Sequence, residues 1–170
     1  MTLLNCTSLL TSLPLWSLNP STSVTHYFHW SAELMFGFWR TYSSLDPSIT
    51  SSGNTTLAPP RRMFFVHISA DRWRDYVSPN QWVPRGAFPS IALQFSGDWA
   101  VRERTGRLFV FDRVILADRA AAMKGSGFLH TDRTASEPFA LPGSVYWWNT
   151  VRGNVIEAAG LNLLPWQFRS

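Results

Sequence analysis

The chain has one cysteine, one lysine and no long apolar run, and each of these scarcities excludes a class of function. Cys6 is the only cysteine among 170 residues, so the chain can form no internal disulfide, no cysteine-based zinc site and no redox pair. Lys124 is the only lysine beside fourteen arginines, which are scattered without a basic run. We therefore expect no nucleic acid as a partner. Because no run of about 18 apolar residues exists, we also expect no transmembrane segment in this chain.

What is present is the composition of a folded domain. Hydrophobic residues make up 45% of the chain and charged residues only 15%, and nine tryptophans and twelve phenylalanines are available for a core. Arginine suits bidentate contacts with phosphate or carboxylate, so the net charge of +4 is compatible with a phosphorylated ligand. The simpler interpretation of the excess of arginine over lysine is codon usage in a GC-rich genome.

Two sequons make Asn5 and Asn54 candidate glycosylation sites. Asn54 lies in the polar stretch SITSSGNTTLAPP, which we expect to be an exposed loop. Glycosylation requires a luminal location, yet the N-terminus has no basic region and no small-residue cleavage site and is a poor signal peptide. The two observations point in opposite directions, and the sequence alone leaves the compartment open.

The pattern of apolar and turn-forming residues predicts strands that alternate with helices. A helix is expected over 29–43, where Phe36 and Trp39 recur at helical spacing, and Pro47 ends it. Further along we expect a loop over 48–62, a buried strand over 63–68, one or two short helical turns over 80–95, a strand over 107–116, a loop over 126–143 and a helix from Ser144 to Gly160.

This order predicts an α/β fold with a mainly parallel sheet. Only three or four strands are expected, fewer than an open parallel sheet usually has, and such a sheet needs both faces covered. We therefore expect an incomplete sheet and one half of a larger protein. Residues 1–24 are expected to form an irregular segment, and residues 25–170 a single α/β domain.

Two histidines and a glutamate interrupt the aromatic run at residues 25–40. On a helix that begins near His29, Glu33 lies one turn further on, so the two side chains can meet and take a proton from a hydroxyl. The alternative is a structural pair that caps the helix and fixes the aromatic cluster. The spacing of His26 and His29 does not match the HExxH motif, and we expect no metal site.

Asp118 and Arg119 follow the strand expected over 107–116 at its carboxyl end, which is where open α/β sheets bind ligands. Asp112 and Arg113 are expected within that strand. For each of the two pairs the alternative is a local salt bridge that fixes a turn, and for Asp112 this is the simpler interpretation. The long loop with His130, Asp132, Arg133 and Glu137 is either functional or a plain surface connection. No Gly-x-Gly-x-x-Gly fingerprint for a dinucleotide is found.

The tryptophans can stack on sugar rings. Trp147 and Trp148 recur within an expected helix and are at best half exposed, because most aromatic residues at helical spacing are core. Trp73, Trp82 and Trp99 lie in less regular regions and are better candidates for a ligand surface.

Three blocks of the sequence resemble the fungal branch of the family 61 glycosyltransferases, which is related to the EGF-domain O-linked N-acetylglucosamine transferase and to plant xylosyltransferases. They are THYFHWSAELMFGFWRTYSSLDPSI, NQWVPRGAFPSIALQFSGDWAVRERTGRLFVFDRVILADRAAAM and RTASEPFALPGSVYWWNTVRGNVIEAAGL. Their order and spacing are similar to those of the family, and they cover most of residues 25–161.

The resemblance implies a Rossmann-like N-terminal half of a two-domain GT-B glycosyltransferase. It implies inverting transfer of a sugar from a nucleotide sugar, a UDP-sugar, to a hydroxyl of a glycan or glycoprotein in the lumen of the Golgi or endoplasmic reticulum. Members usually carry an N-terminal membrane anchor and a second, donor-binding domain, and we expect both to be missing from this chain. We therefore expect no cofactor in this chain, no activity of the chain alone, and self-association through an exposed domain interface.

By the same resemblance His29 matches the motif histidine and Glu33 an acidic position one turn later, so these two are the candidate catalytic residues. The candidate substrate-binding residues are His26, Arg40, Asp118, Arg119 and Arg133. A truncated, non-catalytic remnant that binds at most a glycan or a partner is the alternative. A hydrolase that uses the same His and Glu is less favoured, since no acidic pair is obvious.

Overall fold

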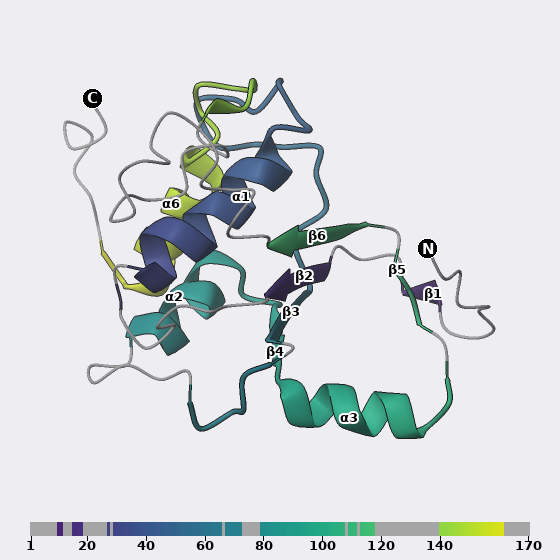
Figure 1. Ribbon diagram of the computed structural model, residues 1–170. Helices are drawn as coiled ribbons and strands as arrows, with labels where there is room; N and C mark the ends of the chain where they lie inside the picture. The colour runs from purple at the N-terminus through teal and green to yellow at the C-terminus, as the bar shows by residue number, and fades with distance from the viewer. Residues whose placement is uncertain are drawn as a thin grey trace, which may run out of the picture.

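The structure is a computed structural model that describes residues 10–11, 15–18, 27, 29–65, 67–72, 79–107, 109–111, 113–117 and 140–161. Its elements alternate between strand and helix (Figure 1). They are β1 (Leu10–Thr11), β2 (Leu15–Leu18), the π-helix η1 (His29–Met35), α1 (Phe36–Ser43), β3 (Arg62–Phe65), α2 (Pro79–Ala87), β4 (Ala92–Gln94), α3 (Ser96–Arg104), β5 (Val110–Phe111), β6 (Val114–Ala117) and α6 (Asn149–Ala158).

The main sheet has four strands in the order β4-β3-β2-β6, and every pair is parallel. Leu15 at the start of β2 pairs with Arg62 on one side and with Val114 on the other. The short strands β1 and β5 form a separate parallel pair. The expected mixed α/β fold with a small parallel sheet is therefore confirmed.

The strand order reverses direction once. From β2 the chain moves outward to β3 and then to β4, and afterwards it returns to place β6 on the opposite side of β2. Because parallel strands point the same way, the ends of β2 and β6 at Leu18 and Ala117 lie at one edge of the sheet, and these two residues are register partners. This pair of strand ends is called the carboxyl edge below.

The core lies between the sheet and the helices η1, α1, α2 and α6, which Figure 1 shows together on one side of the strands. It is rich in aromatic side chains because the expected helical face of 29–43 turns inward. The buried members are Trp30, Met35, Phe38, Trp39, Tyr42, Met63, Phe65, Ile68, Ala87, Phe88, Ile91 and Val151. The expected strand over 63–68 is confirmed as β3, whose Met63, Phe64 and Phe65 are fully buried.

The interpretation of 107–116 as one strand is wrong. Val110–Phe111 and Val114–Ala117 are two strands that belong to two different sheets, so Arg113 lies between strands and not within one. Single-strand periodicity cannot reveal this break, because both halves carry the same β-branched and aromatic residues. Asp112 lies outside the described residues.

Residues 1–24, expected to form an irregular segment, contain the strands β1 and β2. Three further elements differ from the sequence interpretation. The segment expected to form one or two short turns contains the nine-residue helix α2, which accommodates Pro84 in its interior, and the strand β4. The helix α3 was not expected, because it buries no side chain and so has no apolar stripe to recognise. In Figure 1 it lies apart from the other helices, beyond β4.

The last described helix begins later than expected. Residues 145–148 form a turn, and α6 starts at Asn149. The Ser144 hydroxyl accepts a hydrogen bond from the Tyr146 N–H and donates to the Ile49 carbonyl, so it stabilises this turn and ties it to the loop after α1. Gly160 follows the helix with φ of 64°, as expected of a stop residue. Val145, expected on the inner face, is 83% exposed.

Gly53 brings the loop after α1 into close contact with the start of α6. It has φ of +84°, and a Cβ atom there would lie 2.8 Å from the Thr150 backbone nitrogen. We expect Gly53→Ala to destabilise the fold by about 2 to 4 kcal/mol, because strain at positive φ adds to a clash with backbone that cannot rotate away. Urea unfolding measures the loss.

Gly106→Ala is the matched control, because Gly106 also has a positive φ, +59°, but open space around it. We expect it to cost only about 1 kcal/mol. Equal losses for the two variants would show that the contact with α6 contributes nothing to stability.

Candidate functional site

The candidate catalytic residues occur in chain segments that follow β2 and β6, the two strands that end at the carboxyl edge. The helix that follows β2 begins at His29, and Asp118 and Arg119 follow the last residue of β6 directly in the chain. Figure 1 shows the arrowheads of β2 and β6 pointing toward the side where α1 and α2 lie. In open α/β sheets the crevice for a ligand forms at this edge, where the strand order reverses.

Several predicted site residues lie outside the described part of the chain. These are Asn5, His26, Asp118, Arg119, His130, Arg133 and the side chains of His29 and Glu33. The backbone of the last two is described, and both belong to η1. Their assignment as catalytic and substrate-binding residues stays a prediction.

The first half of the expected helix is a π-helix, His29–Met35, and α1 continues it without a break to Ser43. A π-helix closes its hydrogen bonds from residue i to i+5, is rare, and is found frequently at functional sites. The sequence predicts the extent of the helix but not this form, because aromatic spacing of three and four residues fits both.

Arg40, a predicted substrate-binding residue, is buried in α1. One Nη nitrogen donates to the Leu141 carbonyl, and the guanidinium lies 5.5 Å from the centre of the Trp147 ring. Burial lowers the pKa of Arg40 from its ordinary value. These contacts hold the 141–147 segment against α1, so Arg40 has a structural role. The role of Arg40 in substrate binding stays a prediction.

Arg113 is placed over the face of Tyr42, 5.6 Å from the ring centre. The Tyr42 hydroxyl donates to the Ala58 carbonyl at 2.8 Å. Burial raises the pKa of Tyr42, and the charge of Arg113 opposes this shift. The arginine therefore packs on an aromatic ring of the core. The local salt bridge that the sequence suggests involves Asp112, which lies outside the described residues.

Asp46 organises the loop that follows α1. It is buried, and its two carboxylate oxygens accept hydrogen bonds from the Ser48 hydroxyl and N–H, from the Thr55 hydroxyl and from the Thr56 hydroxyl and N–H. The bond from the Ser48 hydroxyl is the largest of several that hold the pKa of Asp46 well below its ordinary value. These hydrogen bonds fix the loop around the exposed Asn54. The sequence predicts only that this loop is exposed.

We expect Asp46→Asn to lower the melting temperature at pH 7, because the amide carries no charge and accepts fewer hydrogen bonds. The folded-state pKa is depressed, so the carboxylate stabilises the fold above its ordinary pKa of 3.8, and this contribution falls away as the pH drops below that value. Melting curves from pH 7 to pH 3 should therefore show wild type and variant converging in acid. Glu103→Gln, at an exposed carboxylate of α3, should show no such convergence, and a pH-independent difference for Asp46→Asn would contradict the assignment.

The tryptophans divide between core and surface largely as expected. Trp147 and Trp148 are half-buried and contact each other. Trp82 and Trp99 are 41% and 42% exposed, but Trp99 already packs edge-on against Phe64. Trp73 lies outside the described residues. Trp82 is thus the described tryptophan that best fits a ligand surface.

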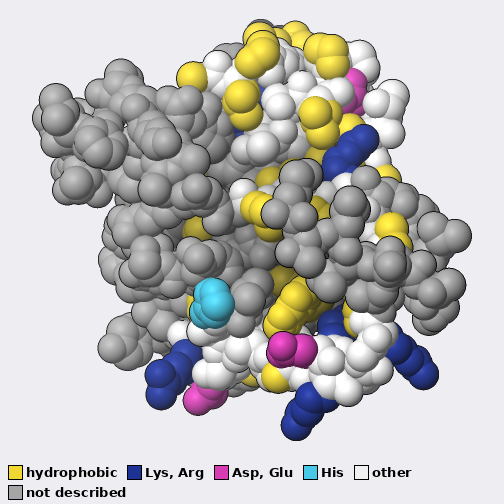
Figure 2. Space-filling model, turned by 45° about the vertical axis from the view of Figure 1, so that its right-hand side comes forward, with side chains coloured by type: hydrophobic (Ala, Val, Ile, Leu, Met, Phe, Trp, Pro, Cys, Tyr) yellow, Lys and Arg dark blue, Asp and Glu magenta, His cyan; other side chains and the backbone are white. Residues whose placement is uncertain are grey.

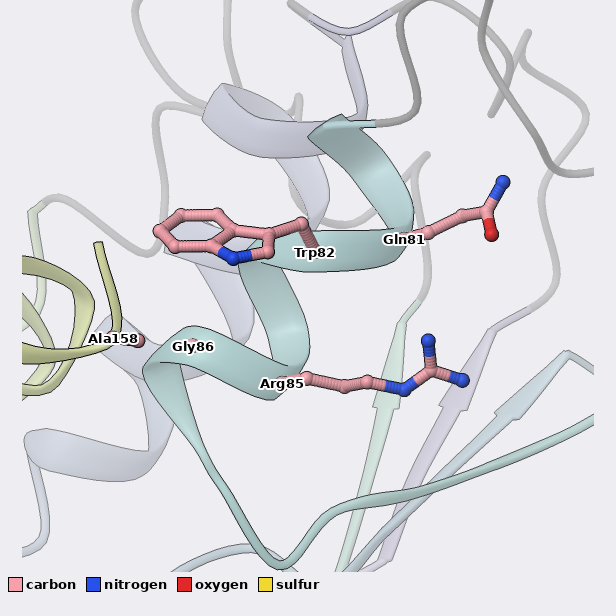
Figure 3. Close-up of a pocket in the computed structure, with 5 residues that line it drawn as sticks. All are labelled: Gln81, Trp82, Arg85, Gly86 and Ala158. Atoms are coloured by element: carbon pink, nitrogen blue, oxygen red, sulfur yellow. The ribbon is translucent and has the colours of Figure 1, made fainter. Parts of the chain in front are cut away.

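Trp82 lines an open pocket of about 360 Å³ together with Gln81, Arg85, Gly86 and Ala158. Figure 3 shows the indole extending over Gly86 toward Ala158 of α6, while Gln81 and Arg85 project from the other side of α2. Sequence reasoning named only Trp82. The spacing of four residues between Gln81 and Arg85, and between Trp82 and Gly86, is a helical signal that the two nearby prolines concealed.

Apart from the residues already named, the described part of the chain shows no further cluster of site residues that the sequence predicts. No three His, Cys, Asp or Glu side chains gather there in a way that could hold a metal ion. Nor does any described helix combine the length and apolarity needed to cross a bilayer. Figure 2 shows one face of the molecule, where basic side chains lie apart from one another along the lower end with acidic side chains between them.

Comparison with known proteins adds no identification. No protein-family model, no curated protein and no solved structure matches this chain. The fold and the two sites described above are therefore the basis for assigning a function.

Proposed function

We propose that this chain is the acceptor-side α/β domain of a glycosyltransferase, which moves a sugar from a nucleotide sugar to a hydroxyl of a glycan or glycoprotein in the secretory pathway. The observation that carries the proposal is the reversal of strand order between β2 and β6. It supplies a carboxyl edge, and the histidine and acidic residues of the resembled family occur in the segments that follow those two strands.

The strand order supports the Rossmann-like, GT-B part of the proposal. Counted along the chain, the main-sheet strands β2, β3, β4 and β6 lie in the order 3-2-1-4, which is the order of the first four strands of a doubly wound nucleotide-binding fold. The separation of α3 from the helices α1 and α2 fits the same arrangement, since the connection that reverses direction passes to the other face of such a sheet.

In the proposed mechanism His29 acts as a general base. It takes the proton from the acceptor hydroxyl as that oxygen attacks the anomeric carbon and the nucleoside diphosphate leaves. A histidine titrates near neutral pH and can accept the proton without a cofactor. Glu33, within one turn of η1, orients the imidazole. The π-helical form of this segment supports a functional assignment, because π-helical turns are rare and are frequently found at functional sites.

The proposed location in the secretory pathway draws on Asn54. This residue is exposed in a loop that Asp46 fixes, so a glycan attached there would project into solvent. Mass spectrometry of the protein from a eukaryotic host tests it, and an unmodified Asn54 in secreted material would contradict it.

Binding measurements on the chain test the assignment to the acceptor side. Calorimetric titration with glycan acceptors should show binding, and titration with UDP-sugars should show little or none, because the resemblance assigns the donor to another domain. Donor binding without acceptor binding would contradict the proposal.

A glycan-binding module without transferase activity is the second candidate function, and the exposed Trp82 pocket favours it. The two candidates differ at His29. A transferase needs its imidazole for turnover, whereas a binding module tolerates its loss.

The exposed apolar side chains of β6, Val114 and Leu116, fit the further proposal that the chain associates through this strand with a second copy or domain. Analytical ultracentrifugation can test this association.

A further inference from the structure

We propose that the sheet face turned away from the core binds the phosphate group of a phosphate monoester between Arg62 of β3 and Arg102 of α3. This face of β3 and β4 is called the outer face below. Arg62 is the first residue of β3, and Arg102 lies in the last turn of α3. The site therefore lies away from the carboxyl edge, and the inference goes beyond the proposed function without resting on it.

The alternation of side chains along β3 places Arg62 on the outer face. Met63 and Phe65 belong to the main core, so Arg62 and Phe64 point to the opposite side of the sheet. Phe64 is buried there because α3 covers it, and its ring packs edge-on against Trp99 with 5.4 Å between the ring centres. The outer face at β3 is therefore a second, smaller contact layer that carries an arginine.

Both guanidinium groups lie close to Phe64 and its neighbour Gln94. Gln94 is the register partner of Phe64 on β4, so it shares the outer face. Arg62 Nη1 donates a long hydrogen bond of 3.5 Å to Gln94 Oε1, and the Arg102 guanidinium lies 5.3 Å from the centre of the Phe64 ring. The two arginines thus converge from β3 and α3 on one patch, where a single small ligand can contact both.

The position of Arg102 leaves its hydrogen-bond donors unused. The guanidinium lies 5.3 Å from the centre of the Phe64 ring and 4.8 Å from that of Phe109, so two aromatic rings hold the cation. A guanidinium has five N–H donors, and within the described residues those of Arg102 make no hydrogen bond. A cation that is held in place with unused donors fits an oxyanion, which accepts two parallel N–H bonds.

No carboxylate neutralises this arginine pair within the described part of the chain. Asp98, one turn before Arg102, accepts a hydrogen bond of 2.8 Å from the Phe95 N–H at the start of α3. Both arginines are half-buried. Burial lowers the pKa of Arg102, the nearby charge of Arg62 lowers it further, and the charge of Asp98 opposes these shifts. An anion bound between the two arginines would remove the repulsion between them.

The two positive charges favour a phosphate monoester over other anions. A carboxylate or a phosphodiester carries a single negative charge. A phosphate monoester carries about −1.5 to −2 near pH 7 and presents three strong acceptor oxygens. Each guanidinium can therefore bind oxygens of the same phosphate group, which suits arginine better than a point contact would.

Titration of the full chain with methyl phosphate and with dimethyl phosphate tests the charge requirement, because the two probes differ by one methyl group and one negative charge. Calorimetry gives the affinities, and the arginine Nε–H signals in NMR spectra locate the binding. We expect methyl phosphate to shift the signals of Arg62 and Arg102 and to bind about tenfold more tightly than dimethyl phosphate. Added salt should narrow this difference.

Three variants locate the site. Arg62→Gln should lower the affinity for methyl phosphate about tenfold and leave the melting temperature unchanged, because the only hydrogen bond of this side chain within the described residues is the long one to Gln94. Arg102→Lys keeps the charge but loses the planar fork, so it should also weaken binding. Arg104→Gln changes an exposed arginine in the same last turn of α3 and is the matched control, which should bind like wild type.

Two further probes identify the source of the phosphate group. Glucose 6-phosphate represents a phosphorylated sugar, and phosphoserine represents a phosphorylated side chain. The probe that binds more tightly than methyl phosphate and loses affinity in Arg62→Gln names the source, and either result supports the site.

Three results would each overturn the proposal: equal affinities for methyl phosphate and dimethyl phosphate, no shift of the Arg62 and Arg102 signals, or equal losses of affinity in Arg62→Gln and Arg104→Gln. Failure here is distinct from failure of the proposed function. His29→Ala should leave methyl phosphate binding intact, whereas it should affect the transferase reaction.

Discussion

His29→Ala is expected to lower the rate of sugar transfer by about 100- to 10,000-fold, which is the usual contribution of a general base. The base acts on the acceptor proton only in the transition state, so kcat and kcat/KM should fall by the same factor while KM changes little. Because the resemblance assigns the nucleotide sugar to a second domain, the substitution is made at the matching histidine of a full-length family 61 enzyme. Glu33→Gln there should give a smaller loss, since Glu33 only orients the ring.

The controls separate chemistry from folding. In this chain His67 is an exposed histidine in the turn after β3, and His67→Ala should leave both the circular dichroism spectrum and glycan binding unchanged. His29→Ala in this chain should also leave the spectrum unchanged. Undiminished turnover in the full-length His29→Ala enzyme would remove the proposed mechanism.

Trp39→Ala is expected to cost about 3 to 5 kcal/mol of folding free energy, the range for removal of a large buried aromatic side chain. Trp39 is 2% exposed, contacts the rings of Tyr42 and Phe88, and donates from Nε1 to the Trp147 carbonyl at 2.6 Å. It therefore joins α1 both to the segment after α2 and to the turn before α6. For a domain of this size the loss corresponds to a fall in melting temperature of roughly 6 to 20 °C.

Trp39→Phe keeps most of the packing and removes the hydrogen bond, so it should cost only about 1 to 2 kcal/mol. Trp99→Ala removes an exposed ring of α3 and should cost less than Trp39→Ala. Thermal and urea unfolding measure all three variants. If Trp39→Ala were no more damaging than Trp99→Ala, the aromatic cluster around α1 would not be the main core.

The sequence predicts two of the elements whose side chains face the core. The helix over 29–43 and the strand over 63–68 carry regular apolar spacing, and both are present in the structure. It does not predict α3, because a helix that buries nothing leaves no periodic signal. The split of 107–116 into β5 and β6 also escapes prediction, since the two strands differ in their partners and not in their composition.

The candidate site residues also divide into those that the sequence predicts and those that it does not. Trp82 could be named as a candidate because it lies between prolines outside the strongest helical patterns. Gln81, Arg85 and Ala158 could not, because their proximity depends on α2 continuing through Pro84 and packing against α6. Arg40 was named as a substrate-binding residue from a resemblance, and only the folded chain shows its contacts with Leu141 and Trp147. The strand order, which defines the carboxyl edge, depends on pairing between distant segments that local patterns do not encode.

Sugar recognition at the carboxyl edge is tested most directly by the imidazole NMR signals of the histidines, assigned through single histidine variants, during titration with a glycan acceptor. We predict that the His29 signals shift and saturate with the glycan, while those of His67 stay unchanged. His29 signals that do not respond to a glycan that demonstrably binds would contradict the proposed acceptor site at this edge.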